Sequence, residues 1–172
     1  MRLLATTAVL LVSAAPGPGP VARQSAALDR ACNATEAAVQ HTVAAAADTT
    51  GGTISSPLQV VLPGTVTGAI AFNPSGWSIS VGAPQTHGSS FGCGQATARH
   101  SGAAGQSRVV STLRDRFTRS GRYRLTFTLN ADGRRILAGL GAAERAYRKR
   151  HPHGNKPPTI AFGVALSYAP AG

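Results

Sequence analysis

The pattern of hydrophobic and polar residues changes along the chain, and each pattern predicts a type of element. Between residues 25 and 47, apolar side chains recur at spacings near 3.6 and follow Ser25, which predicts an α-helix. From Thr53 onward the period is two, as is typical of strands with one buried face. This alternation predicts strands at Leu58–Leu62, Thr65–Phe72, Trp77–Val81, Val109–Phe117, Arg122–Leu129 and Ile160–Tyr168.

Three further features complete the predicted order of elements. The stretch from Gly82 to Gln106 is dense in glycine and serine and predicts a long loop. Arg134 to Arg150 has helical spacing and ends before Pro152, which predicts a second helix. In the strand that begins at Val109, alternation predicts that Val109, Leu113 and Phe117 share one face, opposite Val110, Thr112, Arg114 and Arg116.

Strands of period two joined by turns predict a mainly β fold, an antiparallel β-sandwich with an N-terminal helix and a helical crossover before the last strand. The segment RSGRYRLTFTLNADGRRIL (119–137), together with IAFGVALSYAP (160–170), resembles segments of exported bacterial immunoglobulin-like β-sandwich modules. That resemblance implies a role in binding or architecture, and it carries no catalytic residue over to this chain.

The first residues predict export. Met1-Arg2 is followed by the apolar run Leu3–Val12, then by small residues and several prolines, which is the order found in a secretory signal peptide. Cleavage after Ala15, Ala22 or Ala27 is conceivable, and we favour Ala22 because Pro16 follows Ala15 directly. The predicted division is a signal peptide at 1–22, a helical segment at 23–52 and a β-sandwich domain at 53–172. The expected location is secreted or in the cell envelope, without a transmembrane segment in the mature chain.

Cys32 and Cys93 are the two cysteines of the chain. An even number of cysteines without metal-type spacing, in an exported protein, predicts one disulfide between them. Two free thiols are the alternative. On the chain-entropy model a loop of this length gives about 4 kcal/mol of stabilisation.

The positive charge is confined to the C-terminal part of the chain. Residues 1–98 have no net charge, whereas residues 99–172 have a net charge of +11. Such a field attracts an anionic cell-wall polymer or lipid head groups. Excess charge alone is a weak signal of function, and the plainer interpretation, a surface enriched in arginine for solubility, is preferred for the charge taken by itself. Arginines are not interleaved with exposed aromatic residues, which argues against nucleic acid. The candidate anion-binding residues are Arg114, Arg116, Arg122, Arg124, Arg148, Lys149 and Arg150. If the strands on either side of Thr118–Gly121 pair as a hairpin, the first four share a solvent-exposed face.

A second class of function is an extracellular or cell-wall enzyme that uses the glycine-rich His87–His100 loop. Gly88–Gly92 fits G-x-S-x-G with Ser90 as a serine nucleophile, and Asp115 or Asp132 followed by His151 gives the chain order of a hydrolase triad. Ser90–Cys93 also resembles the nucleophile segment of L,D-transpeptidases, with Cys93 as the nucleophile and Phe91 where that family has histidine. The strand–turn–helix setting that the serine motif needs is not predicted here. The preferred prediction therefore has no catalytic residue, no cofactor and no metal site.

Overall fold

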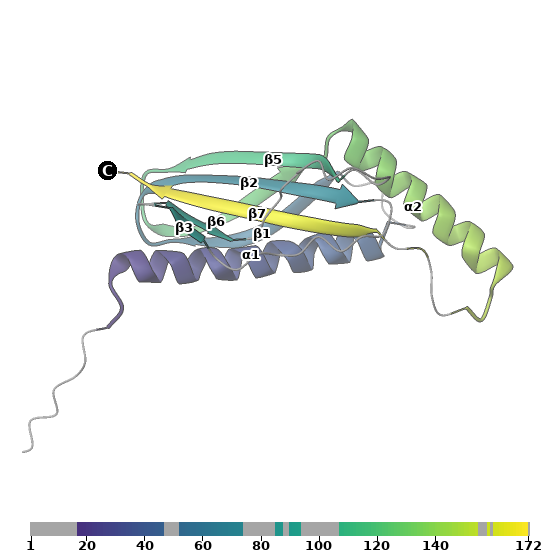
Figure 1. The fold of residues 1–172 in the computed structure, drawn as a ribbon, viewed down its shortest axis with the longest axis horizontal. Coiled ribbons are helices and arrows are strands. Elements are labelled where there is room, and N and C mark those ends of the chain that lie inside the picture. Colours follow the sequence, from purple (N-terminus) through teal and green to yellow (C-terminus); the bar gives the residue numbers. More distant parts are fainter. Residues whose placement is uncertain are drawn as a thin grey trace, which may run out of the picture.

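The computed structural model describes residues 17–46, 52–73, 85–87, 90–93, 107–154, 158 and 160–171. A long N-terminal helix is followed by six strands, a second helix and a last strand, and the N-terminal helix runs beneath the strands (Figure 1). The elements are α1 (Pro20–Ala44), β1 (Thr53–Val60), β2 (Gly64–Asn73), β3 (Gln85–His87), β4 (Ser90–Cys93), β5 (Arg108–Phe117), β6 (Gly121–Thr128), α2 (Ala131–Arg150) and β7 (Ala161–Pro170).

The strands form two antiparallel sheets. One sheet pairs β1 with β6, and the other has the order β3-β4-β7-β2-β5. The sheets are not closed into a barrel, and helix and strand contribute in similar measure. The fold is therefore a mixture of α and β, and the prediction of a mainly β protein is confirmed only in its antiparallel strands.

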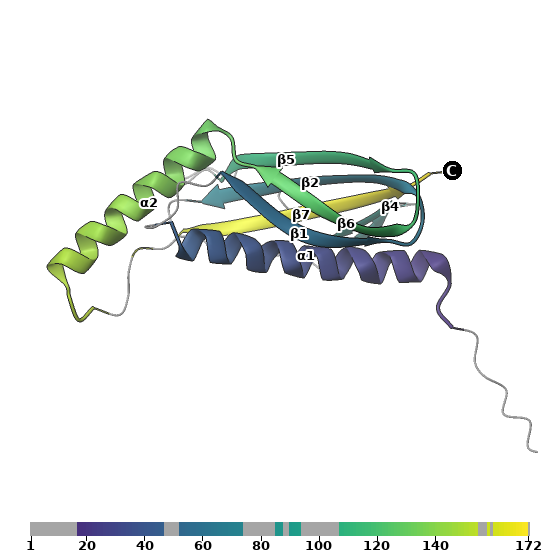
Figure 2. The same ribbon diagram turned by 180° about the vertical axis from the view of Figure 1, so that it is seen from behind.

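Helix α1 joins the two sheets. It contacts β1 of the smaller sheet as well as β7 and β4 of the larger one. β7 lies in front of β1 and β6 in Figure 1, and β1 and β6 lie in front in Figure 2, which shows the molecule from behind. In both views α1 runs along the same side of the two sheets. The core cluster contains residues of α1, both sheets and α2, so the helix packs as part of the same core as the strands.

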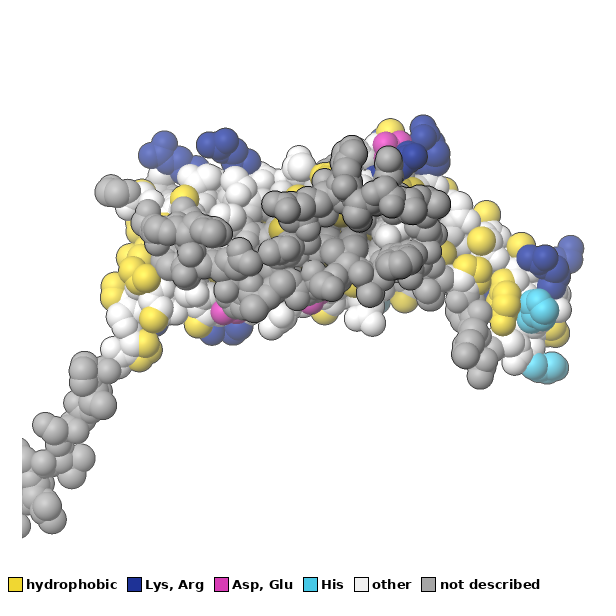
Figure 3. Space-filling model, viewed as in Figure 1, with side chains coloured by type: hydrophobic (Ala, Val, Ile, Leu, Met, Phe, Trp, Pro, Cys, Tyr) yellow, Lys and Arg dark blue, Asp and Glu magenta, His cyan; other side chains and the backbone are white. Residues whose placement is uncertain are grey.

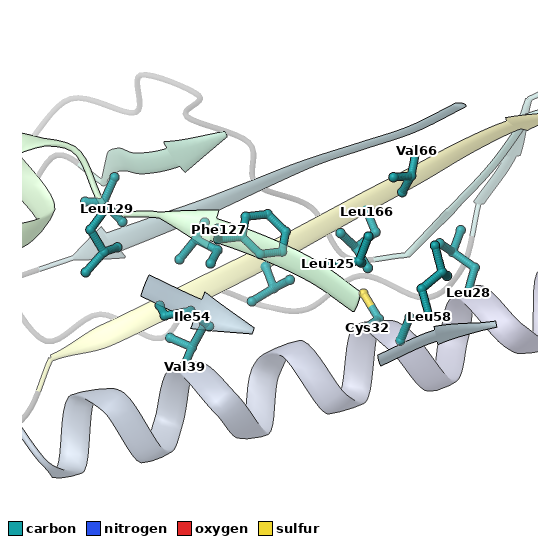
Figure 4. Packing of buried hydrophobic residues seen from close by; sticks show 14 of the residues in the cluster. Leu28, Cys32, Val39, Ile54, Leu58, Val66, Leu125, Phe127, Leu129 and Leu166 are labelled. Carbon is teal, nitrogen blue, oxygen red and sulfur yellow. The ribbon is translucent and has the colours of Figure 1, made fainter. Parts of the chain in front are cut away.

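One face of α1 enters this core because its buried residues recur every three or four positions. In Figure 4, Leu28 and Val39 point toward the apolar side chains of β1, β6 and β7. Thr35 lies on the same face, and its hydroxyl is 2.6 Å from that of Ser56 on β1. Because both hydroxyl groups are buried, this hydrogen bond satisfies two polar groups and fixes the helix on the strand.

The helix begins earlier than predicted. Gly19 is its N-cap and Pro20 occupies the first turn, where the missing N–H costs nothing. The expected cap at Ser25 is therefore wrong, and the observed end at Ala44 precedes the predicted end at residue 47.

The period-two patterns are confirmed for β6 and β7, whose apolar residues alternate into the core. In β2 the alternation holds from Gly64 to Thr67, whereas the four residues from Ile70 to Asn73 are all buried. In β5 the register against β2 shifts between Ile70 and Ala71. Because of this irregularity, Val109 and Val110 lie on the opposite faces of β5 from those predicted: Val110 is fully buried and Val109 is 36% exposed. The predicted orientation of these two valines is wrong for that reason.

The stretch predicted as a loop, 82–106, contains two strands in its described part. β3 and β4 pair antiparallel, and β4 adds to β7 through Phe91↔Tyr168 and its neighbours. A long loop throughout this stretch is therefore wrong. The predicted strand Trp77–Val81 lies outside the described residues.

Helix α2 is confirmed, and it begins at Ala131 because Asn130 caps it. The Asn130 carboxamide oxygen accepts a hydrogen bond of 2.9 Å from the backbone N–H of Gly133. From there α2 projects beyond the sheets (Figure 1). Within the described part of the chain, neither helix combines the length and apolar character needed to cross a membrane.

Candidate anion-binding site

The seven predicted basic residues lie in three places. Arg114 and Arg116 are on β5, Arg122 and Arg124 are on β6, and the remaining three end α2. β5 and β6 follow one another in the chain but belong to different sheets, and Arg122 and Arg124 face Gln59 and Pro57 of β1 in register. The predicted hairpin pairing, with one shared face for four arginines, is therefore wrong.

The β5 pair occupies one side of the larger sheet, facing away from the core. Arg114 stands opposite Thr67 on β2, and Thr67 stands opposite Ser167 on β7. Arg116 stands opposite Thr65 on β2, and Thr65 stands opposite Ala169 on β7. Alternate residues of a strand share a face and lie about 7 Å apart. The result is two parallel rows, each with one guanidinium and at least one hydroxyl group.

These rows border an open hollow of about 470 Å³. It is lined by Gly64, Thr65, Arg114, Arg116, Ala169, Pro170 and Ala171. Gly64 permits the close approach of β7, because a Cβ there would lie 2.5 Å from the carbonyl oxygen of Ala169. The backbone N–H of Ala171 donates to the carbonyl of Pro63 at 2.9 Å and holds the end of β7 beside β2.

Tyr168 supports this end of the hollow from the core side. Its buried phenol donates a hydrogen bond to the carbonyl of Leu62, next to the turn that leads into β2. Burial raises the pKa of Tyr168, and the nearby Tyr123 raises it further. The hydroxyl group therefore keeps its proton at neutral pH, and the turn keeps its donor.

The charge of the β5 pair is not neutralised. Neither the Arg114 nor the Arg116 guanidinium group makes a hydrogen bond or an ion pair in the described part of the structure, and none of the described lining residues is acidic. Asp115, between them, alternates to the opposite side of β5 and is half-buried. Two neighbouring cations without a counter-ion repel each other, so an anion placed between them relieves this repulsion.

The cations of α2 differ. Arg148 donates to the carboxylate of Glu144 through Nε at 2.9 Å, and Glu144 is buried. Arg150 donates from Nε to the carbonyl of Ala146 at 3.2 Å. Figure 3 shows dark-blue side chains in separate groups, along the upper edge of the sheet and at the tip of α2. The structure thus does not gather the seven predicted residues into one site.

The alternative enzyme site is only partly within the described residues. Ser89 and His100 lie outside them, as do the side chains of His87, Ser90 and Cys93. The backbone places Ser90 in the antiparallel strand β4, opposite His87 of β3. A nucleophile elbow instead follows a strand of a largely parallel sheet and leads into a helix.

Two of the other residues of the proposed triads, Asp132 and His151, are engaged elsewhere. Asp132 pairs with Arg135 at 3.1 Å and lies 4.0 Å from Arg108. His151 stacks on Tyr147 with ring centroids 4.8 Å apart, at the end of α2. Within the described ranges, no group of three histidine, cysteine or acidic residues is arranged to hold a metal ion.

The predicted disulfide is compatible with the fold. Cys32 is buried on the face of α1 that meets the sheets, α1 contacts β4, and Cys93 is the last residue of β4. No cysteine among the described residues is a free thiol. The Cys93 side chain lies outside the described residues, so the pairing stays a prediction.

Sequence reasoning missed Thr65, Thr67 and Gly64 as parts of the site. The alternation of threonine in GTVTG predicts a shared face, but only the register with β5 shows that this face is the one with the arginines. Comparison with protein-family models, with curated proteins and with solved structures finds no match. Any function must therefore be inferred from the geometry of the chain itself.

Proposed function

We propose that this protein is an exported, non-catalytic binding domain that holds an anionic cell-envelope polymer against Arg114 and Arg116. The observation that carries the proposal is the pair of unneutralised guanidinium groups on one face of β5, each in a row with a threonine hydroxyl. A guanidinium binds phosphate, sulfate or carboxylate oxygens through two parallel hydrogen bonds. Threonine hydroxyls at the base of the same rows can donate to the remaining oxygens.

The shape of the site favours a polymer. Arg114 and Arg116 lie about 7 Å apart along one strand, so two successive acidic groups of an extended chain can contact them in turn. Lipid head groups would instead favour cations gathered on one broad surface, whereas the cations at the tip of α2 stand apart from those along the upper edge of the sheet (Figure 3).

Nucleic acid fits less well. Single strands are held by exposed aromatic rings between the cations. Phe127 is fully buried in the core and Tyr123 is half-buried against Phe117, with ring centroids 4.6 Å apart. Among the described residues, the large hydrophobic side chains that are exposed are Val21 and Val109, and neither is aromatic.

The same proposal includes the finer fold and the place of action. Two antiparallel sheets around a common core support a helix-braced relative of the immunoglobulin-like β-sandwich, with a Cys32–Cys93 disulfide that ties α1 to β4. The apolar run Leu3–Val12 after Arg2 supports export to the cell envelope.

Retention on immobilised heparin tests the binding site. The double variant Arg114→Ser/Arg116→Ser should elute at clearly lower salt than the wild type. The matched control Arg122→Ser/Arg124→Ser removes the same charge from the smaller sheet. These two arginines also have no acidic partner among the described residues, but they do not line the hollow, so this variant should elute close to the wild type. Equal shifts for both variants would mean general charge attraction and contradict the proposal. Binding to anionic vesicles that survives in the first variant would point to lipid instead.

A further inference from the structure

The turn between β1 and β2 is bonded through its backbone to a buried side chain of α1. Gln24 is completely buried, and its side-chain oxygen accepts hydrogen bonds from the backbone N–H groups of Val61 at 2.6 Å and Leu62 at 3.1 Å. Its amide nitrogen donates to the carbonyl of Gln59 at 3.5 Å. One side chain therefore binds three backbone groups at a single turn.

Strand β7 holds the other side of the same turn. The phenol of Tyr168 donates to the carbonyl of Leu62, and the carbonyl of Pro63 accepts from the backbone N–H of Ala171 at 2.9 Å. Ala171 lines the hollow that also contains the two arginines of β5. The turn is therefore held between α1 and the end of β7, and Gln24 supplies the bonds from the α1 side.

The chain continues from this turn directly into the site. Gly64 and Thr65 both line the hollow, and Arg116 stands opposite Thr65 in register. Gly64 packs so closely on β7 that a Cβ there would lie 2.5 Å from the carbonyl oxygen of Ala169. Such close packing leaves little room for the turn to shift alone. A displaced turn would carry Thr65 with it and change its place relative to Arg116.

From these contacts we propose that Gln24 is a positioning residue of the anion-binding site and acts on it through the β1–β2 turn. Gln24 does not line the hollow itself. Its neighbour one turn along the helix, Leu28, points toward apolar side chains of the core (Figure 4). A polar group in such surroundings is unfavourable unless it is hydrogen-bonded, and here the bonded groups are those of the turn. The inference rests on the proposed function, because it gives Gln24 a part in the same site.

A pair of variants on the same helix face tests this role. Gln24→Met keeps the length of the side chain and removes the acceptor. The matched control, Thr35→Val, removes another buried hydrogen bond between α1 and β1, the one to Ser56, away from the turn. Both variants should be less stable than the wild type, so binding is measured at a temperature at which both are folded.

Only Gln24→Met should raise the dissociation constant for a heparin oligosaccharide, by about threefold, which is less than the loss of one whole hydrogen bond. The salt dependence of binding should keep its slope, because Arg114 and Arg116 both remain. Gln24→Asn, which is too short to reach the turn, should show the same loss and replaces Gln24→Met if that variant does not fold. Equal affinities, or equal losses, in the Gln24 and Thr35 variants would mean that Gln24 serves the fold alone and would overturn the proposal.

Amide NMR of the free protein separates this inference from the proposed function. We expect the backbone amide signals of Thr65 and Ala171 to move in Gln24→Met and to stay in place in Thr35→Val. Unmoved signals in Gln24→Met would overturn the positioning role, whatever the protein binds. A wild-type affinity for heparin that does not depend on Arg114 and Arg116 would overturn the proposed function instead.

Discussion

The arginines of β5 and of α2 carry the same charge in opposite surroundings. Arg148 is held by the buried carboxylate of Glu144, and Arg135 by Asp132. Arg114 and Arg116 have no such partner in the described part of the chain. The difference teaches that charge density along the sequence does not locate a binding site. Two features together distinguish the β5 pair: neither guanidinium group has an acidic partner among the described residues, and both line the same hollow.

The largest expected effect concerns binding. Removing both β5 arginines should lower the affinity for heparin by at least about tenfold, because each charge-assisted hydrogen bond contributes about 1.5–3 kcal/mol. The salt dependence of binding should weaken as well, with a log–log slope smaller by roughly two. Titrations at several salt concentrations measure both quantities. Arg148→Ser/Arg150→Ser is the control. An equal loss of heparin affinity in that variant would show that the arginines of β5 and of α2 contribute alike, and would contradict a binding site on β5.

A smaller effect concerns stability. Arg148→Ser should lower the free energy of unfolding by about 1 kcal/mol, because the buried Glu144 carboxylate loses its cation. The figure is modest because the Arg148 side chain is 71% exposed, which screens the pair. Lys149→Ser, the adjacent exposed cation, should have little effect. Urea denaturation compares the two variants, and equal stabilities would show that the pairing in α2 does not matter.

The complementary change on β5 should be nearly neutral. Arg116→Ser removes an exposed cation with no described partner, so unfolding should change by no more than about 0.5 kcal/mol. Any change should be a gain, because Arg114 loses a like-charged neighbour. A substantial loss of stability in thermal denaturation would mean that Arg116 serves the fold rather than a ligand.

The smallest expected effect is on thermal stability, and it concerns an acidic residue whose charge has no partner. Glu36 on α1 has a buried carboxylate oxygen without a hydrogen-bond partner, and burial raises its pKa above the ordinary 4.5. Because the folded protein binds this proton more tightly, the stabilisation is complete below about pH 4.5 and is lost as pH rises through the raised pKa. Glu36→Gln should therefore melt at a higher temperature than the wild type at pH 7, with a smaller difference at pH 4. A difference that does not change with pH would contradict this explanation.

Much of the fold follows from short-range pattern. Strand β7 can be predicted from the sequence because Val164, Leu166 and Tyr168 alternate with small residues, and this order alone defines a buried face. The burial of Val110 in place of Val109 cannot be predicted from the sequence, because the register shift depends on how β5 pairs with β2. Local sequence defines alternation, whereas the partner strand decides where alternation is interrupted.

The site was predictable in its residue type but not in its grouping. Arg114 and Arg116 must share a face if β5 is extended, and they do. The short turn between the strands predicts that Arg122 and Arg124 join them on one face, yet β6 pairs with β1. The Glu144–Arg148 spacing, in contrast, was available as an i,i+4 helical pair and could have shown that Arg148 is engaged. Gln24 is buried on α1 and accepts hydrogen bonds from the backbone N–H groups of Val61 and Leu62. The sequence does not predict this contact, because a glutamine on a helix is ordinarily exposed.

Side-chain NMR of the arginines tests the central claim most directly. The guanidinium Nε signals of the wild-type protein are followed while a heparin oligosaccharide is added. We predict that the largest shifts occur at Arg114 and Arg116, accompanied by shifts in the backbone amides of Thr65 and Thr67. Shifts that concentrate at Arg148 and Arg150, or that spread evenly over all arginines, would contradict a binding site on β5.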